Sequence, residues 1–284
     1  MTAYLSIVLL PGWVYLASCF VEDSFYNLLV NRVRTALFRP VTGLQRLSPR
    51  LSEKAAAGLL LAFALVACAT LPVALGWEPE ILFGGIHSVR VHIDRRALQS
   101  LAAAVGLQLA AFALLLGQLA LLRLAFALRG RAADGALAEF LGTATWPLPR
   151  RARPEAVAAA AAGCLLAGGA LAAWSASDVL FLRPHAPSGV LGSPALPLRL
   201  ALLGAIDLLR LLRWVLIACC VLSWAQFVAP AARGVSDVAN LVLQDLMRLV
   251  LGGRDLAVGF VSFGPLILWW ILGYVHPLLA GLVL

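Results

Sequence analysis

The chain has 284 residues, of which 62% are hydrophobic and 13% charged, with a mean hydropathy of +0.93 and a net charge of +8. About a quarter of the residues in a soluble domain are charged, so this composition excludes an ordinary soluble protein. Several apolar runs of roughly twenty residues match the ~30 Å hydrocarbon core that a transmembrane α-helix crosses. We count six such runs. We therefore expect an all-α, polytopic membrane protein with about six transmembrane helices.

The six runs are arranged as three helical hairpins. In each hairpin, two apolar spans flank a linker that carries arginine residues. The predicted hairpins cover residues 1–76, 101–176 and 200–284, and the outer loops between them cover 77–100 and 177–199. The pattern is an internal repeat, a feature that decides the fold and therefore has to be recognised before local structure is assigned.

The basic residues are concentrated in the linkers inside the hairpins. Linkers 22–54, 129–154 and 229–255 contain 14 arginine and lysine residues, whereas loops 77–100 and 174–199 contain five. Cytoplasmic loops of membrane proteins carry an excess of positive charge. We therefore expect the linkers on the cytoplasmic side of the cell (inner) membrane and both termini outside. This topology explains the net positive charge without nucleic-acid binding.

The first linker is predicted to contain an amphipathic helix that lies in the membrane interface. Apolar residues within 25–37 follow three-and-four spacing, and Arg32 and Arg34 take the other side. Arg39 precedes Pro40, which ends the helix because proline disfavours a helical conformation of the residue before it. The alternative is a solvated basic loop.

The other two linkers show related patterns. In the second, a short helix is predicted over Ala136–Gly142, and Trp146 then stands close to Arg150 and Arg151. Indole and guanidinium groups both suit the headgroup layer of a bilayer. In the third linker, Asn240–Leu251 is amphipathic and is predicted to be helical.

The two outer loops differ in character. The segment SVRVHID within 77–100 alternates and predicts a short strand or an extended segment. Residues 174–199 contain many prolines and glycines and predict an irregular loop. His87 and His92 stand five residues apart in the first loop. No carboxylate or thiol accompanies them at ligand spacing, so we do not expect a metal site there.

A stripe of small residues occupies every fourth position in the second span of the second hairpin. In lipid, such stripes let helix backbones approach closely. We expect this helix at the centre of the bundle or at a subunit contact, and the alternative is an alanine-rich composition with no packing role. The stripe consists of Ala156, Ala160, Cys164, Gly168 and Ala172.

Three charged residues interrupt the first span of the third hairpin, namely Asp207, Arg210 and Arg213. Asp207 and Arg210 are three residues apart and can pair on a helix. Charges inside a membrane span are functional candidates. The alternative is that they lie near one end of a long span and extend to the interface. In the last span, Gly264–Pro265 is predicted to kink the helix.

No catalytic motif was found in the sequence. It contains no glycine-rich phosphate loop, no His-Glu-x-x-His and no Gly-x-Ser-x-Gly. The five cysteines lie in or beside apolar spans and are expected to be buried thiols. We expect a non-enzymatic protein without a cofactor, whose partners are the lipid bilayer and other integral membrane proteins or a second copy. Helix breaks at Pro11–Gly12 and Gly264–Pro265 leave a small-solute or ion channel, or a transporter, as the alternative.

Three groups of segments show parts of one pattern, namely a membrane helix ending in Ser-Trp, an amphipathic helix, a proline/arginine turn and a second membrane helix. These groups are Ser223–Trp224 with Asn240–Leu251, Phe38–Pro40 with Pro49, and Phe140–Pro149 with Arg150 and Arg151. The pattern resembles the repeat of the YggT family. Family members typically have two repeats, whereas three are predicted here, and the third linker lacks the proline turn. The resemblance implies a small non-enzymatic membrane protein with a scaffold or assembly role. Bacterial members are linked to osmotic tolerance and plastid relatives to cofactor assembly of a cytochrome complex.

Overall fold

The computed structural model describes residues 80–84, 87–91, 98–129, 136–145, 148, 152–176, 178–181, 195–224, 233–251, 257–258, 261–262 and 264–283. The predicted first hairpin, residues 1–76, lies outside the described residues. So do all the residues predicted to form interfacial linkers, namely Arg32, Arg34, Arg39, Pro40, Trp146, Arg150 and Arg151.

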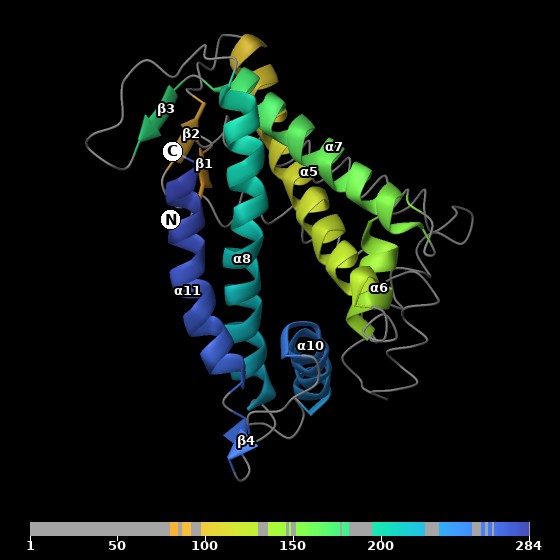
Figure 1. The fold of residues 1–284 in the computed structure, drawn as a ribbon. Coiled ribbons are helices and arrows are strands. Elements are labelled where there is room, and N and C mark those ends of the chain that lie inside the picture. The colour runs from red at the N-terminus through yellow and green to blue at the C-terminus, as the bar shows by residue number, and fades with distance from the viewer. Residues whose placement is uncertain are drawn as a thin grey trace.

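Four long helices dominate the described part of the chain, and each falls largely within a predicted span. They are rich in leucine and alanine, which favour helix formation. In Figure 1 α8 and α11 run side by side from top to bottom of the view. α5 and α7 lie beside each other and run at an angle to that pair. The four helices are α5 (Leu98–Leu128), α7 (Pro154–Ser175), α8 (Leu196–Ser223) and α11 (Gly264–Leu282).

Three helices in the described residues are long and apolar enough to cross a membrane, namely Ala102–Leu128, Pro154–Ser175 and Gly264–Leu282. The coarse prediction of a mostly helical chain with membrane-spanning segments is therefore supported. The fourth long helix, α8, has 28 residues but carries four charged side chains. These are Arg199, Asp207, Arg210 and Arg213.

The last helix begins later than the sequence pattern predicts. Residues Ala257–Val258 (β4) and Val261–Ser262 (β5) pair as a small antiparallel hairpin, and α11 starts after them at Gly264. The predicted kink at Gly264–Pro265 is wrong. Proline is favoured in the first turn of a helix, because its missing N–H has no intrahelical partner there, so Pro265 starts α11 and does not bend it.

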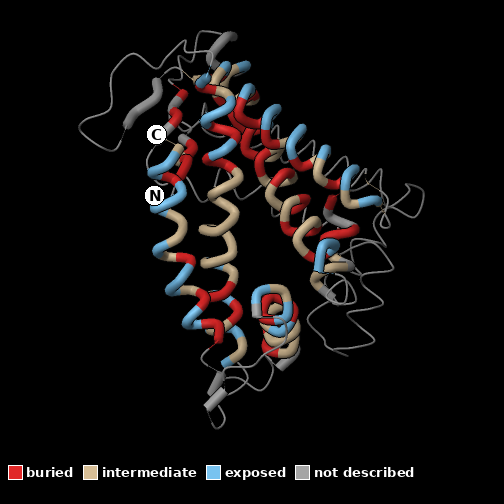
Figure 2. Tube along the Cα trace, viewed as in Figure 1, coloured by how far each residue is buried: buried red, intermediate tan, exposed pale blue. Residues whose placement is uncertain are grey.

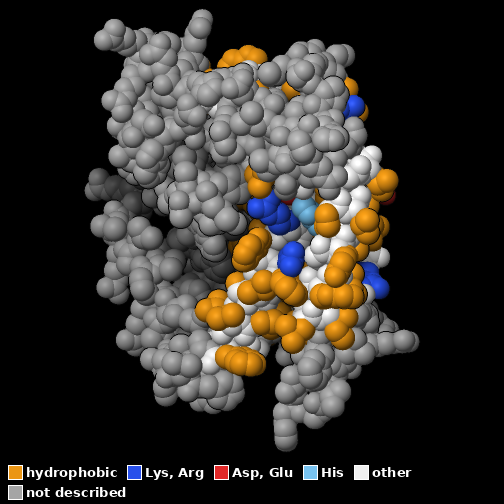
Figure 3. Space-filling model, turned by 90° about the vertical axis from the view of Figure 1, so that its left-hand side faces the viewer, with side chains coloured by type: hydrophobic (Ala, Val, Ile, Leu, Met, Phe, Trp, Pro, Cys, Tyr) orange, Lys and Arg blue, Asp and Glu red, His pale blue; other side chains and the backbone are white. Residues whose placement is uncertain are grey.

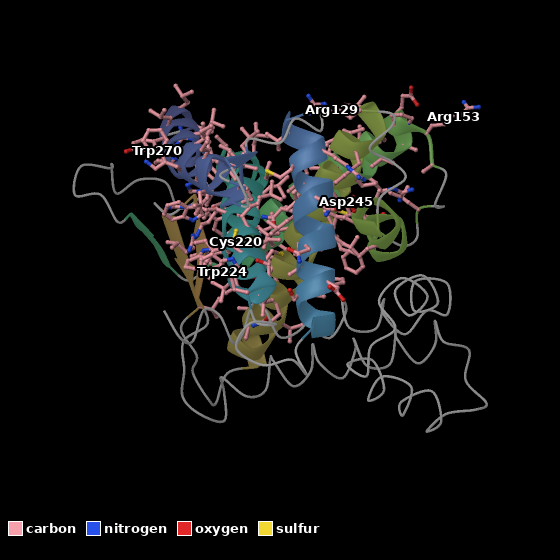
Figure 4. All side chains as sticks on the ribbon, turned by 90° about the horizontal axis from the view of Figure 1, so that it is seen from below. Arg129, Arg153, Cys220, Trp224, Asp245 and Trp270 are labelled. Atoms are coloured by element: carbon pink, nitrogen blue, oxygen red, sulfur yellow. The ribbon has the colours of Figure 1, made fainter. Side chains whose placement is uncertain are left out.

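Two further helices, α6 (Ala136–Ala144) and α10 (Arg233–Leu251), lie at one end of the four long helices (Figure 1). They confirm the helices predicted over Ala136–Gly142 and Asn240–Leu251, and α10 extends further toward its N-terminus. In Figure 1 α10 is seen end-on, and in Figure 4 it is seen lengthwise. It therefore lies crosswise to α8 and α11.

A three-stranded antiparallel sheet lies at the opposite end. It consists of β1 (Glu80–Phe83), β2 (His87–Arg90) and β3 (Asp178–Phe181), in the order β1-β2-β3. β2 confirms the predicted strand. β3 corrects the prediction of a wholly irregular loop over 174–199, and the sheet corrects the all-α fold class to a mostly helical chain with a small sheet.

The sheet packs on the helices through its apolar side chains. Phe83 and Val89 are fully buried, in the same cluster as Leu107 of α5 and Leu200 and Leu203 of α8. Figure 2 shows buried positions where the helices face one another and at the sheet, with exposed positions along the outer sides of α7 and α11. The sheet is therefore part of the main apolar core.

The outer helix surfaces are strongly apolar. Trp174 of α7, Trp214 of α8, and Trp270 and Leu278 of α11 are each more than half exposed. Large contiguous apolar surfaces on a protein mark contacts with lipid or with other proteins. The exposed faces of these helices are consistent with the membrane-spanning lengths given above.

Candidate functional site: a polar seam between α8 and α11

Three of the four charged residues of α8, namely Asp207, Arg210 and Arg213, lie along its middle. Asp207 and Arg213 contact α11 residues, and Arg210 stands between them on the helix. From α11, Trp269 and His276 complete the group. We call these five residues the polar seam. Asp207, Arg210 and Arg213 stand near the middle of α8, which runs from Leu196 to Ser223.

Asp207 joins three segments that are far apart in the sequence. Its Oδ2 accepts a hydrogen bond from the backbone N–H of Gly84 at 2.8 Å. Its Oδ1 lies 3.1 Å from Nε2 of His276, and the two side chains are only 15% and 13% exposed. Because buried polar groups need partners, this carboxylate is satisfied only when the β1–β2 turn, α8 and α11 are in place together.

Gly84 lets the turn after β1 approach the two helices. Its φ of +59° lies in the left-handed region, which glycine adopts at little cost. A Cβ atom at this position would lie 2.7 Å from Cδ2 of Leu203 and 3.4 Å from Cβ of Ala280. The absence of a side chain therefore brings the Gly84 N–H within reach of Asp207.

Arg213, six residues after Asp207 on α8, also contacts α11. Its guanidinium carbon lies 4.3 Å from the centroid of the Trp269 ring, a cation–π contact. Such contacts contribute about 0.5–2 kcal/mol, depending on exposure. The same guanidinium lies over Gly273, where a Cβ would be 3.1 Å from Cζ. The indole nitrogen of Trp269 is buried without a hydrogen-bond partner.

Two further polar contacts connect α5 with its neighbours. Gln118 donates a hydrogen bond from Nε2 to the Gly204 carbonyl of α8 at 2.8 Å. Arg123, which is 7% exposed, donates from Nη1 to Oγ1 of Thr145 at 2.6 Å, and Thr145 in turn bonds the Leu141 carbonyl. These residues could not be predicted from the sequence, because a lone Gln or Arg inside an apolar run does not reveal which helix it faces.

Asp245 fixes the crosswise helix α10. It is 5% exposed, and its Oδ2 accepts the Leu137 N–H at 2.9 Å in the first turn of α6. A carboxylate at a helix N-terminus satisfies a free N–H and interacts favourably with the helix dipole. At the other end of α10, Ser236 bonds the carbonyl of Ser223 at 2.7 Å. Both linker helices are therefore hydrogen-bonded to their surroundings.

The small-residue stripe of α7 is divided between packed and open positions. Gly168 and Ala172 are buried, Ala160 and Cys164 are half-buried, and Ala156 is exposed. The stripe as predicted therefore runs from the surface into the core.

The closest helix contacts involve glycines. A Cβ at Gly168 would lie 2.7 Å from Cγ of Leu114, and one at Gly117 would lie 2.7 Å from Cγ of Leu165. A leucine of each helix, α5 and α7, thus packs against a glycine of the other. Gly169, outside the stripe, faces Ala201 of α8, whose backbone nitrogen would lie 2.8 Å from its Cβ.

Within the described residues, no group of three or more His, Cys, Asp or Glu side chains is placed to hold a metal ion. The described cysteines, Cys164, Cys219 and Cys220, are free thiols that are buried or half-buried. At the polar seam, the contact between Asp207 and His276 and the cation–π contact between Arg213 and Trp269 link α8 with α11.

Comparisons of the chain with protein-family models, with curated proteins and with solved structures found no match. The resemblance to the YggT family stays a prediction. The function is inferred below from the residues and their geometry.

Proposed function

We propose that this chain is a non-enzymatic integral membrane protein that acts as a structural subunit or assembly factor of a larger membrane protein complex. The observation that carries the proposal is the division between its inner and outer surfaces. Inside the bundle, Asp207 and Gln118 are hydrogen-bonded within the chain, while the outer faces of α7, α8 and α11 present large apolar side chains.

A fixed arrangement of helices suits a protein that presents a surface to partners. The polar links tie the sheet, α8 and α11 together at Asp207 and tie α6 to α10 at Asp245. Such long-range bonds favour one relative placement of the helices, and a preorganised surface binds with a smaller entropic cost. In this proposal α6 and α10 lie on the cytoplasmic side, because linkers 129–154 and 229–255 carry eight arginines and loops 77–100 and 174–199 carry five.

The alternative is a small-solute or ion channel that uses Asp207, Arg210 and Arg213. A gating carboxylate has to exchange its partners as the pathway opens. In the structure Asp207 is bonded on both oxygens, to Gly84 and to His276. This double engagement favours a structural role over gating.

Site-specific photo-crosslinking in native membranes tests the proposal. A benzophenone amino acid at Ile271, which is 44% exposed on α11, is expected to give discrete adducts with other membrane proteins. The matched control is Leu272, the next residue, which is 8% exposed and is expected to give no intermolecular adduct. Identification of the adducts by mass spectrometry then names the complex.

Two results would contradict the proposal. The first is an Ile271 adduct pattern containing only lipid. The second is solute flux in liposomes that is carried by the purified chain and lost in Asp207→Ala, which would establish the channel instead.

A further inference from the structure

Arg213 is held in an unusual environment for a cation. It lies in an apolar stretch of α8, and its contact is with the face of the Trp269 ring, not with an anion. Within the described residues, no carboxylate lies within ion-pair distance of its guanidinium. Asp207, on the same helix, is bonded to Gly84 and His276. The neighbouring Arg210 has interactions of its own.

The surroundings of Arg213 are apolar. Trp214, the next residue on α8, is 57% exposed, and Trp270 and Ile271 on α11 are also exposed. Figure 3 shows basic side chains and a histidine on this side of the molecule, bordered by hydrophobic side chains. A cationic group in such a surface is costly in lipid unless an anion pairs with it.

The position of Arg213 along α8 decides which anion can reach it. At about 1.5 Å per residue, Arg213 stands roughly 21 Å from Arg199 and roughly 16 Å from Trp224 along the helix axis. If α8 crosses a bilayer whose hydrocarbon core is about 30 Å thick, this places Arg213 well inside the core. Lipid phosphates lie outside that core, so the matching anion at this depth is a carboxylate on another transmembrane helix.

The apolar spans in the chain's own first hairpin do not supply this group. Residues 4–21 and 55–76 contain no Asp or Glu, and the acidic residues of that hairpin, Glu22, Asp23 and Glu53, stand in the linker between the two spans. Because these two spans contain no acidic residue, a different protein is indicated as the source of the carboxylate.

We propose that Arg213, with Trp269 and Gly273 beside it, is the docking point for a transmembrane helix of a partner protein that carries Asp or Glu near its middle. Gly273 presents no side chain, which leaves room for the guanidinium of Arg213 to lie over it. Trp269 holds the guanidinium over its ring and limits its rotamers before the partner binds. This inference rests on the scaffold function proposed above and names the chemistry of its partner.

The test uses the full chain in nanodiscs of zwitterionic lipid and two synthetic transmembrane peptides. Each peptide is a leucine/alanine helix of about 22 residues that spans the core, with Glu at its centre in one and Gln in the other. Association is measured by energy transfer between dyes on peptide and chain. Wild type is expected to bind the Glu peptide about five- to thirty-fold more tightly than the Gln peptide, the range for one polar contact between helices in lipid.

The variants assign this preference to Arg213. Arg213→Gln is expected to lose it, and Arg213→Lys to keep part of it. The matched control Arg199→Gln, at the exposed start of α8, is expected to keep it fully. Size-exclusion and circular dichroism profiles of each variant verify that the helices remain folded, so that a lost preference reports the missing charge.

Several outcomes overturn the inference. These are equal binding of the two peptides by wild type, retention of the preference in Arg213→Gln, and Arg213-dependent self-association of labelled chains without peptide. Arg213-dependent enrichment of anionic lipid in mixed vesicles, with no peptide preference, overturns it as well.

Photo-crosslinking separates this inference from the scaffold proposal. Adducts at Ile271 that are unchanged in Arg213→Gln leave the scaffold proposal standing and overturn only the role of Arg213. Absence of protein adducts at Ile271 in wild type overturns the scaffold proposal itself.

Discussion

The pair α5–α7 and the pair α8–α11 are held together by different forces. α5 and α7 interlock through small residues, with Leu114 against Gly168 and Leu165 against Gly117. α8 and α11 are joined by polar groups, of which the Asp207–His276 contact is the clearest. Close packing of this kind depends on shape alone, whereas the polar contact also depends on a third segment, the turn at Gly84. The interlocking leucines and glycines of the first pair come from its own two helices, whereas the Asp207 contact of the second pair also needs the turn at Gly84.

The largest effect is expected from filling the α5–α7 contact with Gly168→Leu. A Cβ at this position already meets Leu114 at 2.7 Å and the Ala110 carbonyl oxygen at 3.1 Å, and backbone cannot move aside cheaply. Overpacking costs typically 1–3 kcal/mol, and we expect a loss of about 3 kcal/mol in the free energy of unfolding. Unfolding by sodium dodecyl sulfate in mixed micelles, followed by circular dichroism, measures it.

Gly163→Leu is the matched control on the same helix. Nothing lies within 4 Å of its Cβ position, so we expect no loss, and a small gain from the helix propensity of leucine over glycine. Equal losses in the two variants would show that glycine at Gly168 is not needed for packing.

Asp207→Ala is expected to have the next largest effect. It leaves the Gly84 N–H and the His276 ring without an acceptor, and an unsatisfied buried group costs about 1–3 kcal/mol. Hydrogen exchange at the Gly84 amide measures the effect on the turn separately. Exchange of this amide should become faster while the helix amides remain protected. Asp207→Asn, which keeps one acceptor oxygen, should fall between wild type and alanine. Unchanged Gly84 exchange in the alanine variant would show that Asp207 does not hold the turn.

Asp245→Ala extends the comparison to the linker helices. It removes the acceptor for the Leu137 N–H, and loss of a helix cap costs about 1 kcal/mol. We expect faster amide exchange in the first turn of α6 and a small loss of overall stability. Asp237→Ala on the same helix is the control, since Asp237 is only half-buried. The same effect from both variants would argue against a specific cap.

The smallest effect is expected from Gly273→Ala within the α8–α11 pair. The new Cβ would lie 3.1–3.3 Å from the guanidinium of Arg213, but that group ends a flexible side chain and can shift. We expect a change below about 0.5 kcal/mol in stability. The tryptophan emission spectrum should shift, because the guanidinium moves relative to Trp269. A loss as large as that of Gly168→Leu would mean that the two helix pairs depend on close packing to the same degree.

The sequence predicted what depends on local composition. The apolar spans, the helices α6 and α10 and the strand at residues 87–90 follow from hydrophobic periodicity, which neighbouring residues express together. The partners of Asp207 could not be predicted in this way. Gly84 and His276 stand 123 and 69 residues away, and no local pattern encodes which distant group meets a carboxylate.

Two errors have a more specific cause. Pro265 was interpreted as a kink because the apolar pattern continues through it, although a proline next to a helix start is equally compatible with a first turn. β3 was missed because residues 178–181 are surrounded by prolines and glycines, and the pairing with β2 that makes them a strand is not visible locally. A signal did exist for Gly84, which lies in the Gly-Gly between two apolar segments typical of a hairpin turn.

The three-stranded sheet can form only after β3 has been synthesised. β2 pairs with β3 over a separation of about 90 residues, which a ribosome translates in roughly 5–20 s at its usual rate. During that interval β2 has an unpaired edge, the kind of strand that pairs with foreign chains. The Gly84 amide lacks its hydrogen-bond acceptor for longer, because Asp207 is synthesised 123 residues after it. A growing chain therefore passes through a stage in which α5 and α7 have been made while β3 has not, and biosynthesis has to protect the free edge of β2.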